Sequence, residues 1–96
     1  MNSQRRPLLE QLTALEPSSV LDAARQFFSR RNSLYAAFIE QEGPTYITMR
    51  GQGGEEVVIA ATARPDGGTL VTGSSYLFDA QISRFFSTLP PLQAPA

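Results

Sequence analysis

The residue types that carry out most protein chemistry are missing from this sequence. It contains no Cys and no His, and all eight of its basic residues are Arg. Thiolate nucleophiles, disulfides, zinc–thiolate sites, imidazole proton shuttles and lysine Schiff bases are therefore excluded. We expect a protein that is not an enzyme, with no catalytic residues, no metal site and no cofactor.

Carboxylates are the remaining candidates for acid–base catalysis, and each of them has a simpler structural role. Asp79 falls in the first turn of a predicted helix, where a negative charge is stabilising. Glu55 and Glu56 begin a predicted strand, and Asp66 belongs to a predicted turn. No nucleophile and base stand at a spacing that would pair them, so carboxylate catalysis is a minor alternative.

Phosphate and nucleic-acid binding are also disfavoured. The glycine-rich stretch 51–54 is followed by a predicted strand and has no lysine, so it lacks the context of a phosphate-binding loop. Arg30 and Arg31 complement the end of a predicted helix. The net charge of −1 is unlike that of a nucleic-acid binder, and we expect no nucleic-acid partner.

The N-terminal region is predicted to be an arm, residues 1–17, with a short amphipathic helix. Leu8, Leu9, Leu12 and Leu15 have helical spacing, and Pro17 is expected to end the segment. Such a short helix must dock on something. Its own domain, a partner protein, and a membrane surface reached through residues 5–15 all remain open.

The rest of the chain predicts one α+β domain over residues 18–89, followed by a flexible Pro-rich tail over residues 90–96. A second helix is expected to begin at Ser19, whose hydroxyl forms a capping box with Asp22. The remaining predicted elements are strands over 34–40, 45–50, 56–64 and 69–73, a turn over 65–68, and a helix over 76–89. This α-ββββ-α order gives a two-layer sandwich: a four-stranded antiparallel meander with both longer helices on one face.

The predicted core combines one face of the strands with the apolar stripes of the two longer helices. Its members are Val20, Ala24, Phe27, Leu34, Phe38, Ile47, Met49, Val57, Ile59, Ala61, Leu70, Phe78, Ile82, Phe85 and Leu89.

The order of helix, four strands and helix over residues 18–89 resembles part of the TATA-binding-protein-like and helix-grip families. The resemblance is one of topology and includes no sequence motif. It implies a curved sheet with the C-terminal helix lying across it, and it implies no function.

The sheet face opposite Val57, Ile59 and Ala61 is unusually apolar and small-sided, which suggests a contact surface. We therefore expect a protein-interaction module: an accessory subunit of a larger complex, or a homodimer. The candidate contact residues are Tyr35, Tyr46, Thr48, Arg50, Val58, Ala60, Thr62 and Arg64 on the sheet, and Leu8, Leu9 and Leu12 on the N-terminal helix. The alternative is a small domain of helix-grip type that binds an apolar ligand between the sheet and the C-terminal helix.

No segment has the length of a transmembrane helix. The longest apolar run, 57–61, is far shorter than the roughly 20 residues that a span requires. Glu10 and Glu16 interrupt any signal-peptide core. A cytoplasmic protein is the default expectation.

Overall fold

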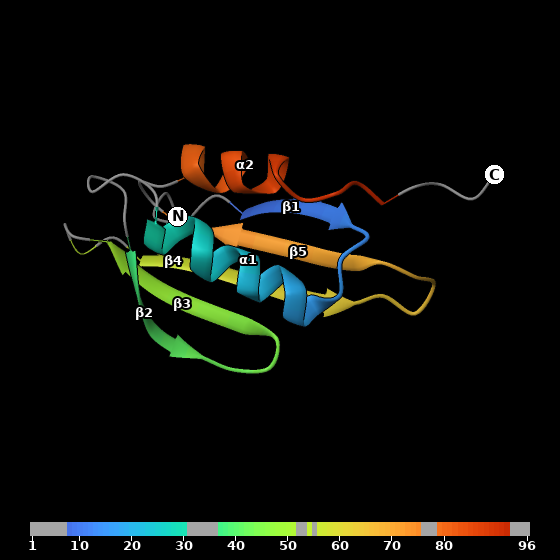
Figure 1. The fold of residues 1–96 in the computed structure, drawn as a ribbon, viewed down its shortest axis with the longest axis horizontal. Helices are drawn as coiled ribbons and strands as arrows, with labels where there is room; N and C mark the ends of the chain where they lie inside the picture. The colour runs from blue at the N-terminus through green and yellow to red at the C-terminus, as the bar shows by residue number, and fades with distance from the viewer. Residues whose placement is uncertain (1–7, 31–36, 52–53, 55, 76–78, 93–96) are drawn as a thin grey trace, which may run out of the picture.

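The fold consists of one five-stranded antiparallel sheet with two helices (Figure 1). The computed structural model describes residues 8–30, 37–51, 54, 56–75 and 79–92. Its elements are β1 (Leu8–Thr13), α1 (Pro17–Arg30), β2 (Ala37–Glu42), β3 (Tyr46–Gly51), β4 (Glu56–Ala63), β5 (Thr69–Ser74) and α2 (Asp79–Ser87). The strand order across the sheet is β1-β5-β4-β3-β2. The predicted α+β class and the meander from β2 to β5 are therefore confirmed, and the sheet has one more strand than predicted.

The predicted N-terminal helix is wrong, because residues 8–13 form the edge strand β1. This strand pairs with β5 in an unbroken register that runs from Leu8 opposite Ser74 to Thr13 opposite Thr69. A helix this short makes few internal hydrogen bonds. Pairing with β5 instead provides hydrogen-bond partners for the backbone groups on the inner side of the segment, and Thr13 becomes completely buried. Residues 8–13 are thus part of the same sheet as the rest of the domain.

Helix α1 begins at Pro17, the residue that we expected to end a helix. Proline suits the first helical turn because the backbone N–H that it lacks would have no intrahelical partner there. The Val20 amide donates to the Glu16 carbonyl at 3.0 Å, so the helical hydrogen bonds start ahead of the predicted cap at Ser19. Asp22 forms an ion pair with Arg25 rather than completing a capping box.

Both helices pack on the same face of the sheet, where buried side chains of α1 and α2 form a single cluster with those of β3, β4 and β5. Val57, Ile59 and Ala61 on β4 are all completely buried in this cluster. The core prediction is confirmed for Val20, Ala24, Ile47, Met49, Val57, Ile59, Ala61, Ile82, Phe85 and Leu89, and Phe27 packs against the cluster while only partly buried.

The core prediction is wrong for Leu70, which lies on the opposite face, while its neighbour Val71 is buried. Leu21, Phe28 and Phe86 belong to the core in addition to the predicted set. The predicted core residues Leu34, Phe38 and Phe78 lie outside the described side chains.

Phenylalanine rings join the two helices. The ring centroid of Phe85 on α2 lies 5.5 Å from that of Phe27 and 5.7 Å from that of Phe28, both on α1. Phe86 follows at 6.1 Å from Phe85. Edge-to-face and tilted ring pairs at these separations stabilise more than burial alone. Both helices thus contribute Phe side chains to the core.

Two further segments lie outside the helices and strands: the turn after β4 and the chain that follows α2. The turn after β4 follows the prediction, with Gly67 and Gly68 at φ angles of 108° and 79°. Beyond α2, Pro90 and Pro91, which we assigned to the flexible tail, run beside β1. The Thr13 hydroxyl donates to the Pro90 carbonyl at 2.6 Å, and Pro91 forms a β-bridge with Thr13.

Candidate functional site

The candidate site is the sheet face that the helices leave uncovered, which we call the open face. Along β3, β4 and β5, buried residues that face the helices alternate with more exposed residues that face away, and on β1 the exposed positions are Leu8, Glu10 and Leu12. The open face consists of Leu8, Glu10 and Leu12 on β1; Leu70, Thr72 and Ser74 on β5; Glu56, Val58, Ala60 and Thr62 on β4; and Tyr46, Thr48 and Arg50 on β3.

Most of the predicted contact residues lie together on this face. The strand register places Tyr46 opposite Ala60 and Thr48 opposite Val58. The two neighbouring pairs are Ala60 with Thr72 and Val58 with Ser74. The centre of the open face therefore carries mainly small apolar and hydroxyl side chains.

Two of the N-terminal leucines lie on the open face because they are on a strand, and not on the helix that the sequence predicted. On a helix, Leu8, Leu9 and Leu12 would share one stripe. On strand β1, Leu8 and Leu12 lie on the open face and are 62% and 39% exposed, whereas Leu9 packs against the core. Leu9 is therefore removed from the candidate contact residues, and Leu70, which pairs with Leu12, joins them.

Tyr35 and Arg64 complete the set of candidate contact residues on the sheet. Tyr35 lies outside the described residues. Arg64 follows the end of β4 and lines a shallow, open hollow of about 420 Å³ together with Glu10, Gln11, Leu12 and Leu70. The lining of this hollow combines two leucines and one glutamine with one charge of each sign.

The arginines of the open face are already engaged by the protein. Arg50 donates from Nη2 to Glu40 Oε1 at 2.9 Å and from Nη1 to the Gly54 carbonyl at 2.8 Å, and Glu56 Oε2 lies 4.0 Å from Nη2. Arg64 Nη2 lies 3.2 Å from Asp66 Oδ2. Two neutralised arginines make this face a poor electrostatic site for an anion.

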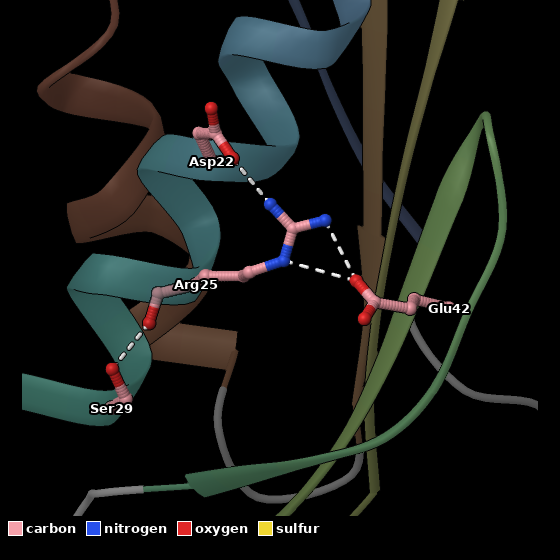
Figure 2. Close-up of polar contacts among 4 residues, drawn as sticks. All are labelled: Asp22, Arg25, Ser29 and Glu42. Carbon is pink, nitrogen blue, oxygen red and sulfur yellow. Dashed lines mark hydrogen bonds and ion pairs between the residues drawn. The ribbon is translucent and has the colours of Figure 1, made fainter.

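A third arginine fastens the helical layer to the sheet edge (Figure 2). Arg25 on α1 donates from Nη2 to Glu42 Oε1 on β2 at 2.7 Å, and its Nη1 also contacts Asp22. The hydrogen bonds that Arg25 donates to the Glu42 carboxylate are the main cause that raises the pKa of Arg25. Exposed pairs of this kind contribute about 0–1 kcal/mol. The pair therefore contributes little to the stability of the fold.

The carboxylates considered for catalysis do not converge. Asp79 is exposed at the start of α2, Asp66 pairs with Arg64 in the turn after β4, and Glu56 lies near Arg50 at the opposite end of that strand. Glu55 lies outside the described residues. Within the described ranges, no three Cys, His, Asp or Glu side chains gather closely enough to hold a metal ion.

A search of the described part of the chain for membrane-spanning helices found none of sufficient length and apolarity. Comparison of the chain with protein-family models, with curated proteins and with solved structures found no match. The function therefore has to be argued from the open face itself.

Proposed function

We propose that this protein is a non-catalytic protein-interaction module, an accessory subunit of a larger complex or a homodimer, that binds through the open face of its sheet. The observation that carries the proposal is the continuity of this face. Its central pairs combine Val58, Ala60 and Tyr46 with threonine and serine, and it ends at the exposed leucines of β1.

The composition of the open face fits an interface better than a solvated surface. Interfaces are depleted in charged residues at their centre and carry aromatic residues as anchors. Here the charged residues lie at the margins, with Arg50 and Glu56 at one end and Arg64 at the other, and Tyr46 lies beside Ala60. Small side chains across the centre allow a partner's surface to approach the backbone closely.

The alternative, an apolar ligand between the sheet and α2, receives less support. The rings of Phe27, Phe28, Phe85 and Phe86 meet in that layer, and Ile82 packs so closely on β5 that a Cβ added at Gly73 would lie 2.7 Å from it. A ligand would have to displace well-packed side chains, which is unfavourable.

The test compares two substitutions that each add one carboxylate. Val58→Glu changes the centre of the open face, and Gln26→Glu changes the exposed surface of α1. Each tagged variant is expressed in the native host and purified, and its sedimentation coefficient and its co-purifying proteins are compared with those of the wild type. We expect Val58→Glu alone to lose the partner or to dissociate the homodimer. A monomeric wild type, with the same co-purifying proteins as both variants, would show the proposal to be wrong.

A further inference from the structure

The two edges of the sheet are built differently. The β2 edge carries three consecutive exposed polar residues, Glu40, Gln41 and Glu42, and its pairing register shifts between Ile39 and Gln41. Charged residues and bulges are the usual devices that prevent an edge strand from pairing with another chain. The β2 edge therefore has the protection that a solvent-facing edge requires.

The β1 edge has only one charged residue, Glu10, and no bulge. Its six residues pair with β5 with no register shift, and Leu8 and Leu12 are the most exposed large apolar residues of the open face. Among the described residues, the outer side of β1 is paired only at Thr13, by the bridge to Pro91. The segment from Leu8 to Leu12 thus offers a regular, largely apolar edge to an incoming strand.

Charge defines what this edge would accept. Glu10 lies between Leu8 and Leu12 on the open face, and no ion pair reaches it from the described part of the chain. Residues directly opposite each other in an antiparallel pair, if of opposite charge, contribute about 0.2–1 kcal/mol, and like charges destabilise. An incoming strand is therefore favoured if it places a cation opposite Glu10 and apolar side chains opposite the two leucines.

A second copy of β1 does not meet this requirement. Antiparallel pairing about a twofold axis at Glu10 would place the Glu10 carboxylates of both copies opposite each other. An axis at Gln11 would need the outer side of Thr13, which Pro91 occupies. An axis at Leu9 would place Leu8 of one copy opposite Glu10 of the other, so that the carboxylate would face a leucine instead of a cation. The β1 edge is thus not self-complementary.

We propose that β1 accepts an extended segment of a different protein as a sixth strand, with a Lys or Arg facing Glu10 between two apolar residues that face Leu8 and Leu12. This inference rests on the proposed interaction function and names the chemistry of the partner. The hollow lined by Leu12, Leu70 and Arg64 lies beside this edge and provides space for one of the apolar side chains.

The test uses fluorescein-labelled peptides of alternating pattern and measures their affinity by anisotropy. The peptide TVTKTVT presents a cation between two valines, TVTETVT presents a carboxylate in its place, and TVPKPVT replaces two strand residues by proline, which cannot donate to a ladder. We expect the full chain to bind the lysine peptide roughly fivefold more tightly than the glutamate peptide, and to protect backbone amides of residues 8–12 from hydrogen exchange. The proline peptide should not bind.

Charge reversal at the edge sharpens the test. Glu10→Lys should invert the preference between the two peptides, Glu10→Gln should abolish it, and Glu16→Lys, an identical change of charge outside β1, should leave it intact. Equal affinities for both peptides, no inversion by Glu10→Lys, or protection outside β1 would overturn the inference. If no peptide binds while Val58→Glu still loses the native partner, the inference fails and the proposed function stands. If Val58→Glu also has no effect, both fail.

Discussion

Strand β4 shows how differently the two faces of this sheet are used. Val57, Ile59 and Ala61 are completely buried under the helices, whereas Val58 and Ala60, which stand between them in the sequence, remain half-buried on the open face. Val and Ala occur on both faces of this strand, with Glu56 and Thr62 also on the open face, yet only one of the two faces has a covering layer. Val58 and Ala60 are therefore not required by the core of a single chain, which supports the proposal that the open face binds a partner.

The largest expected effect lies in the covered layer. Phe85→Ala removes the ring that contacts Phe27, Phe28 and Phe86, and it should lower the free energy of unfolding by about 3–5 kcal/mol. Urea denaturation followed by circular dichroism measures this loss. If the variant does not fold, Phe85→Leu gives a smaller loss in the same direction. A loss below about 1 kcal/mol would mean that the rings do not form the centre of the core.

The same substitution on the two faces of β4 tests the comparison most directly. Val57→Thr buries a hydroxyl among apolar side chains and should cost about 1–3 kcal/mol. Val58→Thr places the same hydroxyl on the open face, where the change should stay within about 0.5 kcal/mol. Equal costs in chemical denaturation would show that the open face is as tightly packed as the covered one.

Removing the side-chain hydrogen bond between β1 and the C-terminal segment should have an intermediate effect on the free energy of unfolding. Thr13→Val keeps the shape of the side chain but removes the hydroxyl, which donates to Pro90 and accepts a 3.3 Å hydrogen bond from the Leu15 amide. The loss of these bonds should cost about 1–2 kcal/mol. It should also speed hydrogen exchange of the Ala14 amide, which donates to the Pro90 carbonyl. Unchanged exchange at Ala14 would indicate that the backbone bridge holds the segment without the hydroxyl.

Breaking the ion pair between Arg25 and Glu42 should have the smallest effect on the free energy of unfolding. The hydrogen bonds that Arg25 donates to Glu42 raise the pKa of Arg25. The contribution of the pair to stability is therefore fully present below the ordinary pKa of arginine and is lost only as the pH rises through the still higher folded value. The guanidinium thus stays charged across the neutral range, and salt is the practical way to weaken the pair. Arg25→Met should cost no more than about 1 kcal/mol, less in 1 M NaCl. A salt-independent loss in denaturation would point to the packing of the side-chain stem.

Peptide binding to β1 would extend the comparison from the two faces of the sheet to its two edges, β1 and β2. It would show that the exposed apolar surface continues from the open face to a strand edge, and that the acidic β2 edge is excluded from binding. Because β1 and β2 flank the same sheet, a peptide that protects residues 8–12 but not 37–42 from hydrogen exchange would separate the two edges within one molecule.

Local sequence patterns determined much of this protein. Three local patterns each specify one structure through their own spacing. They are the alternation along Tyr46–Gly51 and Glu56–Ala63, the glycines of the turn at 67 and 68, and the helical stripe of Ile82, Phe85 and Leu89. For the same reason, the composition of the open face on β3 and β4 could be written down before the structure was known, since residues two apart in a strand must share a face.

Tertiary structure decided between helix and strand where the local pattern of apolar residues fits the periods of both. Leucines at 8, 9 and 12 suit a helical stripe, and the alternation of Leu8, Glu10 and Leu12 equally suits a strand; pairing with β5, nearly sixty residues away in the sequence, made the choice. The same pairing turned Leu70 outward beside Leu12 and left Val71 in the core. No local signal reports such a distant partner, and so the sequence alone did not reveal the β1 edge, on which the inference about the partner depends.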